Sequence, residues 1–139
     1  MIKLPPGPWS EWDIQEFDSS RLRLAANYDL TYYHGLEVVF TDVAYLACPT
    51  QFTDPTFREP TRDERELVRR HVGEDPPLIV AFDLEPLIGS REPLPCLIAA
   101  ETVEVVIGNV YRYWRDDLAP GERLSPRVRP PSENPAGEK

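Results

Sequence analysis

The sequence predicts an α+β domain, in which a mostly antiparallel, curled sheet of about six strands carries one helix. Three observations support this prediction. The run from residue 21 to residue 48 has no proline and one glycine, and its apolar residues alternate with the period of two that half-buried strands show. One helical segment follows that run. Apolar, strand-like segments come after the helix.

The run Arg21–Cys48 is expected to form three strands joined by short turns. Its first turn is predicted at His34–Gly35, because glycine adopts the positive φ that tight hairpins require. A second turn is predicted at Thr41–Asp42, and Pro49 ends the third strand. A curled sheet or half-barrel suits such long strands, and a flatter sheet with the helix across one face is the alternative.

The helix is expected to begin after Thr61 and to end at Gly73. Thr61 and Glu64 have the spacing of a capping box, in which each side chain accepts a hydrogen bond from the other residue's backbone N–H. Glycine is the usual residue where a helix ends in the left-handed conformation. The helix therefore has a start signal and a stop signal of its own.

Three further strands are predicted after the helix, at Leu78–Leu84, Cys96–Ala100 and Val103–Trp114. The last of these is apolar on both faces, which is typical of a central or covered strand. Gly108 interrupts it and is interpreted as the position of a β-bulge.

The sequence divides into three parts. Residues 1–19 form a proline-rich arm that is expected to pack on the domain, although a single helical turn around Ser10 is an alternative there. Residues 20–115 form a single α+β domain. Residues 116–139 are rich in proline and poor in apolar residues, so they are predicted to be a disordered tail.

The net charge of −9 limits the classes of partner. Residues 1–115 carry −8 of it, so the acidity belongs to the domain. A negative surface repels nucleic acid and anionic membranes and favours a basic protein. The chain has no stretch of signal-peptide or membrane-span character, so a cytoplasmic protein is expected.

The sequence contains no spaced motif for nucleotide, zinc or acyl-transfer chemistry. No catalytic residue, metal site or cofactor is therefore predicted, and a binding role is favoured over an enzymatic one. Cys48 and Cys96 are expected to be free, buried thiols rather than a disulfide framework.

One group of residues has the composition of a binding surface. Tyrosine is enriched at protein interfaces, and a carboxylate or imidazole beside it can add polar contacts. The alternative interpretation is that these side chains only pack the sheet, and for His34 the further possibility of a general base stays open. The candidate binding residues are Asp29, Tyr32, Tyr33, His34, Tyr111 and Tyr113.

In size, acidity and lack of motifs, the chain resembles the small bacterial inhibitors known as immunity proteins, which block toxins. The resemblance implies a protein-binding module with a basic protein partner, which it would meet by electrostatic steering. Two alternatives remain at this stage. One is a small-molecule-binding or catalytic domain with a pocket inside the curled sheet near Tyr32, His34 and Tyr111. The other is a homodimer or larger structural assembly.

Overall fold

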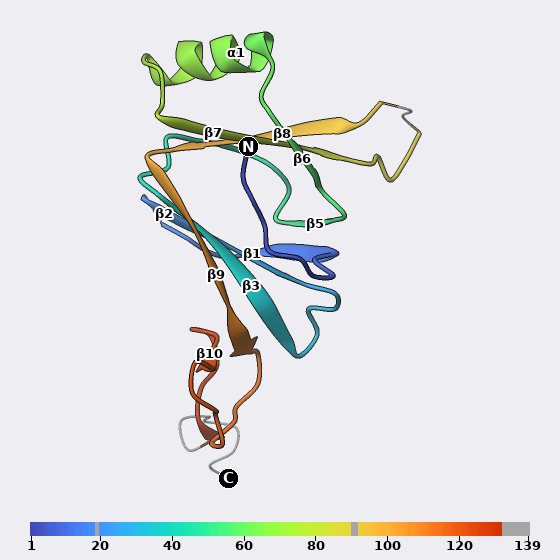
Figure 1. Ribbon diagram of the computed structural model, residues 1–139, viewed down its shortest axis with the longest axis vertical. Coiled ribbons are helices and arrows are strands. Elements are labelled where there is room, and N and C mark those ends of the chain that lie inside the picture. Colours follow the sequence, from blue (N-terminus) through green and yellow to red (C-terminus); the bar gives the residue numbers. More distant parts are fainter. Residues whose placement is uncertain (19, 90–91, 132–139) are drawn as a thin grey trace.

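The computed structural model describes residues 1–18, 20–89 and 92–131, and it arranges them in three layers (Figure 1). One layer is a six-stranded sheet in the order β10-β9-β3-β2-β1-β5. Every strand pair in this sheet is antiparallel except β10 with β9, which is parallel. Its strands are β1 (Glu11–Phe17), β2 (Arg21–Asn27), β3 (Tyr33–Thr41), β5 (Gln51–Thr53), β9 (Thr102–Tyr111) and β10 (Arg123–Leu124).

The second layer is a four-stranded antiparallel sheet in the order β4-β8-β7-β6, and the helix α1 (Arg62–Val72) forms the third layer on its outer face. The α+β class with one helix is therefore confirmed. The strands of this smaller sheet are β4 (Tyr45–Ala47), β6 (Thr56–Arg58), β7 (Leu78–Leu84) and β8 (Leu94–Ala100).

The mostly antiparallel sheet of six strands is present, but the remaining strands form a second sheet that was not expected. The chain leaves the larger sheet after β3, at Asp42, whose φ is 55°, and β4 then pairs with β8 instead of returning beside β3. The physical reason is that β7 and β8 carry apolar residues on both faces. Such strands are most stable when both of their faces are covered.

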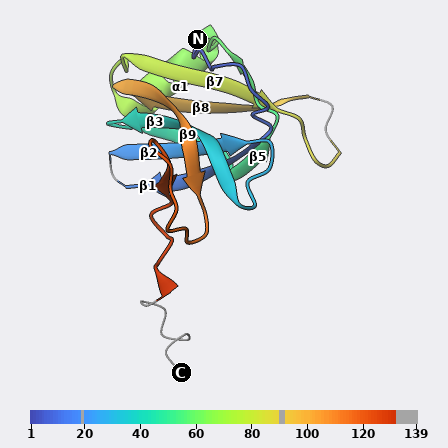
Figure 2. The same ribbon diagram turned by 60° about the horizontal axis from the view of Figure 1, so that its bottom comes forward.

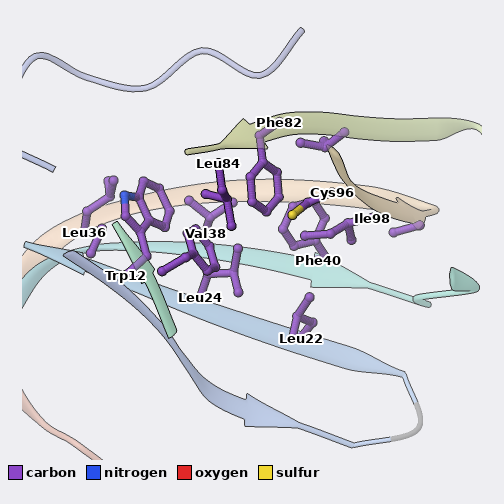
Figure 3. Packing of buried hydrophobic residues seen from close by; sticks show 14 residues of the cluster. Trp12, Leu22, Leu24, Leu36, Val38, Phe40, Phe82, Leu84, Cys96 and Ile98 are labelled. Carbon is purple, nitrogen blue, oxygen red and sulfur yellow. The ribbon is translucent and has the colours of Figure 1, made fainter. Parts of the chain in front are cut away.

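The main core fills the space between the two sheets (Figure 3). Alternate residues of β2 and β3 face alternate residues of β7 and β8 across this space, as expected for two packed sheets. Trp12 of β1 joins the same core and is almost completely buried. The largest apolar side chains of the core are Trp12, Leu22, Leu24, Leu36, Phe40, Phe52, Phe82, Leu84 and Ile98.

The helix packs on the other face of the smaller sheet through a narrow contact. Val68 is its only buried residue, and it lies against Ala81, Leu97 and Ala99. The small alanine side chains leave room for the helix to approach the strands. The predicted capping box between Thr61 and Glu64 is confirmed, as is the left-handed end at residue 73, where φ is 90°.

The first turn does not lie at His34–Gly35, where it was predicted, because both residues are buried inside β3. The chain reverses over residues 28–32 instead. Asn27 Nδ2 donates to the backbone oxygens of Asp29 and Tyr33, and Asp29 Oδ1 accepts from the backbone N–H of Thr31. Local side-chain hydrogen bonds of this kind stabilise a turn without glycine.

Two boundaries differ from those expected. Residues 11–17, assigned to the proline-rich arm, form β1 between β2 and β5 of the larger sheet, because Trp12 belongs to the core. In the segment expected to be disordered, residues 123–124 pair with β9 as β10, and Ser125 is buried. The last part of that segment, residues 132–139, lies outside the described residues.

Candidate functional site

Four tyrosines form one cluster where β3 begins and β9 ends. Tyr33 and Tyr111 have ring centroids 5.8 Å apart, and Tyr111 and Tyr113 also lie 5.8 Å apart. Tyr32 meets Tyr113 edge to face at 6.2 Å. We call Tyr32, Tyr33, Tyr111 and Tyr113 the tyrosine cluster.

The strand register brings these residues together. Tyr33 pairs directly with Tyr111 in the antiparallel ladder between β3 and β9. Beyond the end of β9, the Arg112 backbone N–H still donates to the backbone oxygen of Tyr32 at 2.8 Å. Because side chains alternate along an extended chain, Tyr111 and Tyr113 lie on one side while Arg112 lies on the other.

Much of the tyrosine cluster faces solvent. Tyr32 is 66% exposed, Tyr113 44% and Tyr33 39%, whereas Tyr111 is buried beneath them. Exposed aromatic rings held in contact are costly to leave in water and are common at the centre of protein interfaces. The cluster is therefore the most prominent aromatic surface on the described part of the chain.

Charged groups surround these rings. The Arg115 guanidinium stacks on the Tyr111 ring, 4.3 Å from its centroid, and forms two hydrogen bonds with Asp117. Tyr111 donates its hydroxyl proton to Glu122 at 2.9 Å, and this hydrogen bond raises the pKa of the phenol. Asp29 lies in the same 28–32 loop as Tyr32. The charged groups near the tyrosine cluster are thus three carboxylates, of Asp29, Asp117 and Glu122, and the guanidinium of Arg115.

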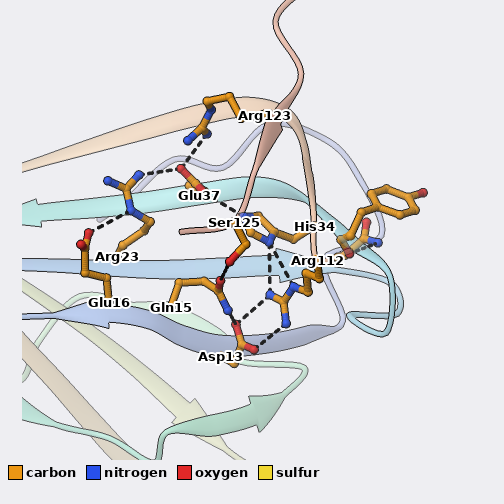
Figure 4. Close-up of polar contacts among 11 residues, drawn as sticks. Asp13, Gln15, Glu16, Arg23, His34, Glu37, Arg112, Arg123 and Ser125 are labelled. Carbon is orange, nitrogen blue, oxygen red and sulfur yellow. Dashed lines mark hydrogen bonds and ion pairs between the residues drawn. The ribbon is translucent and has the colours of Figure 1, made fainter. Parts of the chain in front are cut away.

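A network of buried polar side chains lies behind the tyrosine cluster (Figure 4). At its centre is Glu37 of β3, which is only 2% exposed. Glu37 Oε1 accepts hydrogen bonds from Arg23 at 2.7 Å and from Arg123 at 2.8 Å. Glu37 Oε2 lies 2.8 Å from His34 Nε2, and His34 has no exposed surface.

Arg112 extends this network to β1. It forms a two-pronged ion pair with Asp13, with distances of 2.8 and 3.0 Å, and it also contacts His34 Nδ1 at 3.2 Å. A guanidinium can only donate, so Nδ1 accepts and Nε2 carries the proton shared with Glu37. The order of contacts is therefore Asp13, Arg112, His34, Glu37. This chain of polar groups joins β1, β3 and the residue that follows β9.

The surroundings of Glu37 set its protonation. Burial alone would raise the pKa of this carboxyl, but hydrogen bonds from His34, Arg123 and Arg23 outweigh burial and lower its pKa to about 2. Glu37 is therefore ionised at neutral pH. Every buried side-chain nitrogen and oxygen in the described residues has a hydrogen-bond partner, so the network is fully satisfied.

The structure brings together most of the candidate residues found in the sequence. Tyr32, Tyr33, Tyr111 and Tyr113 share one cluster, and Asp29 lies in the adjoining loop. His34 is different. It has no exposed surface and both of its ring nitrogens are engaged, so it can neither touch a partner nor act as a general base in this structure.

Sequence reasoning missed the charged members of the network. Glu37 had one visible signal, because it is a lone carboxylate within the apolar stretch Leu36–Phe40. Asp13 was assigned to the arm and Arg112 to a strand, and neither showed a sign of its partner. Asp13 and Arg112 lie 99 positions apart, so only folding brings them into contact.

Other kinds of site receive no support from the described residues. In the described part of the chain, no group of three or more histidine, cysteine or acidic side chains is placed to hold a metal ion. Cys48 and Cys96 are free thiols, and burial raises the pKa of Cys48 to about 12 and that of Cys96 to about 11. Thiols of this kind are poor nucleophiles. No helix in the described ranges has the length and apolar character needed to cross a membrane.

Comparison with known proteins yields no relative: no protein-family model, no curated protein and no solved structure matches the chain.

Proposed function

We propose that this protein is a cytoplasmic protein-binding module that docks a basic partner on its tyrosine cluster, in the manner of an immunity-type inhibitor. The observation that carries the proposal is the exposure of Tyr32, Tyr33 and Tyr113. Tyr32 contacts Tyr113, and Tyr111 links both Tyr33 and Tyr113 by ring contacts. Tyrosine supplies a large contact area at a low cost in side-chain entropy, which suits it to interfaces.

Charge supports a basic partner. The chain carries a net charge of −9, and carboxylates outnumber guanidinium groups around the cluster. Lysine and arginine side chains stack well on tyrosine rings, and each such contact contributes about 0.5–1 kcal/mol at an exposed site. An acidic, aromatic surface therefore suits a partner that presents arginine or lysine.

The buried polar network, which lies behind the tyrosine cluster, also supports a binding role. It joins β1, β3, β9 and β10 through charged hydrogen bonds, and Arg112 lies between the two cluster residues Tyr111 and Tyr113. A surface whose backbone is held in this way loses little entropy when a partner binds.

The alternative of a homo-oligomer receives less support. Each edge strand is short: β10 has two residues, and β4, β5 and β6 have three each. Among the described residues, however, most of β9 has no strand on its outer side, because β10 pairs only with Val110 and Tyr111. Self-pairing is therefore opposed by the net charge of −9, which makes copies of the chain repel one another. The alternative of a pocket near Tyr32, His34 and Tyr111 also has less support, because His34 is completely buried.

Affinity capture from lysate of the source cells with matched variants tests the proposal. The wild type is compared with the double variant Tyr32→Ala/Tyr113→Ala and with Leu67→Ala, which removes an exposed apolar side chain from the helix, away from the cluster. We expect one stoichiometric protein to be retained by the wild type and by Leu67→Ala but not by the double variant. Retention should fall as salt is raised above about 0.15 M, because charge steering is screened.

Two outcomes would contradict the proposal. One is retention of the same protein by the double variant at an undiminished level. The other is a failure of the wild type to retain any protein at either salt concentration. Circular dichroism of all three proteins must show the same fold for the comparison to be valid.

A further inference from the structure

A pocket of about 630 Å³ lies at one end of the space between the two sheets. Its walls come from β1 and β5 of the larger sheet, from the 28–32 loop, and from the β7–β8 connection. The part of that connection that directly follows β7, residues 85–89, extends away from the body of the molecule (Figure 2). The volume is within the range of small-molecule sites, which is about 300–1,000 Å³.

The lining of the pocket is mainly apolar. Trp12 and Phe52 belong to it, and their rings stack 5.9 Å apart at an interplanar angle of 11°. Leu30, Leu84 and Leu94 complete the apolar part of the wall. An apolar pocket of this kind binds an aromatic or aliphatic body by removing it from water.

The charged side chains that line the pocket carry an excess of negative charge. Asp13 and Arg112 both line it, but they neutralise each other in their two-pronged ion pair. Two further carboxylates remain. Glu11 uses Oε1 to accept the Leu30 N–H, and within the described ranges neither Glu11 nor Glu85 forms an ion pair. Among the described residues, this rim carries two carboxylates without an ion-pair partner, and such a rim beside aromatic rings favours a cation.

We propose that this pocket binds a small organic cation: an amine or guanidine attached to an apolar body. The body lies against Trp12 and Phe52, and the cationic group lies at the rim near Glu11 and Glu85. This inference does not rest on the proposed function, because the tyrosine cluster contributes no residue to the pocket lining.

Three probes that share one body test the charge preference. 3-Phenylpropylamine is a cation at neutral pH, since alkyl amines have a pKa of about 10.4. 3-Phenylpropanol is neutral, and 3-phenylpropionate is an anion. Each is titrated into the full chain labelled with ¹⁵N, and the backbone amide shifts of Thr31, Gln51 and Thr53, which line the pocket, are followed.

We expect the amine to bind at least about threefold more tightly than the alcohol, and the carboxylate to bind more weakly than either. Glu85→Gln should weaken amine binding about three- to fivefold and leave alcohol binding unchanged. Glu104→Gln removes an exposed carboxylate from β9 and is the matched control, with no expected effect on either probe.

A filling variant tests the location independently of charge. Thr53 is an exposed residue of β5 that lines the pocket, so Thr53→Trp should occupy the space and abolish binding of both the amine and the alcohol. The amide spectrum of each variant shows whether the fold is retained. The proposal is overturned if the carboxylate binds as tightly as the amine, if Thr53→Trp binds like the wild type, or if none of the probes shifts these amides.

Discussion

Glu37 is the residue on which the buried polar network depends. A carboxylate in a strand interior loses its hydration, and this loss is offset only when charged donors replace the lost water. Glu37 accepts from two charged donors, Arg23 and Arg123, and from Nε2 of His34. Removing the negative charge would leave those donors without the group that they were placed to meet.

We therefore expect Glu37→Gln to lower the free energy of unfolding by about 3 kcal/mol, the usual cost of removing one partner from a buried ion pair. Urea denaturation at neutral pH measures this loss. Glu104→Gln, on the exposed face of β9, is the control and should change stability by less than about 0.5 kcal/mol. An equal, small effect of both substitutions would show that the network contributes little to folding.

The lowered pKa of Glu37 makes stability depend on pH. The carboxyl has a pKa of about 2 in the folded protein and an ordinary value of 4.5. Its contribution is therefore complete above pH 4.5 and is lost as the pH falls from 4.5 towards 2, because the unfolded chain takes up the proton first. Glu64 behaves in the same way, since its hydrogen bonds to Arg58 lower its pKa to about 2.

The substitution Glu37→Gln tests whether Glu37 causes this pH dependence of stability. Urea midpoints measured between neutral pH and the acid range should show a gap between wild type and Glu37→Gln that narrows below pH 4.5. A gap that stays constant down to the lowest accessible pH would mean that Glu37 is not the group responsible.

At the scale of the element, α1 depends on its ends more than on its buried face. It buries only Val68, and Arg58 joins it to β7 by contacting both Glu64 and Asp83. A helix of 11 residues with so little buried surface gains little stability from tertiary packing. The capping box therefore contributes a large part of the helix's stability.

We expect Thr61→Ala to cost about 1 kcal/mol of stability, because the Glu64 backbone N–H then loses its capping oxygen. Arg65→Ala changes an exposed position of the same helix and should be nearly neutral. Thermal and urea denaturation of both variants measure the difference. If Thr61→Ala is as stable as Arg65→Ala, water replaces the cap without loss.

At the scale of the whole molecule, the two sheets end in short strands on every side. Sheet edges associate most readily when they are long, flat and apolar. The strands β4, β5 and β6 have three residues each, but β10 pairs only with Val110 and Tyr111, so among the described residues most of β9 has no strand on its outer side. The net charge of −9 produces repulsion between copies, which opposes self-association and leaves the tyrosine cluster for a different partner.

The chain is accordingly expected to be a monomer at about 0.1 mM in moderate salt. Sedimentation velocity measures this directly. A dimer that persists at that concentration would contradict the expectation, and a dimer abolished by Tyr32→Ala/Tyr113→Ala would show that the cluster serves a second copy of this chain.

Several elements were predictable because their signals are local. The stretch Leu78–Leu84 was predicted with the bounds that β7 has, since its apolar residues are interrupted only by Asp83 and the stretch ends before Pro86. The helix was predictable from Thr61, Glu64 and Gly73, which act on backbone groups within one turn. The strands β5, β6 and β10 were not, because two or three residues carry no periodicity and are held only by their neighbours.

The amino-acid sequence by itself determined the α+β class, the ends of the helix, the long strands other than β1, and the candidate tyrosines, because these depend on alternation and capping among residues close in the chain. Only the tertiary structure decided that the strands form two sheets, that His34 is buried, and that Arg112 meets Asp13 across 99 positions. These outcomes depend on which strands pair and which faces are covered. Strand pairing and the covering of faces depend on burial throughout the chain. They therefore leave no pattern within a single segment from which they could be predicted.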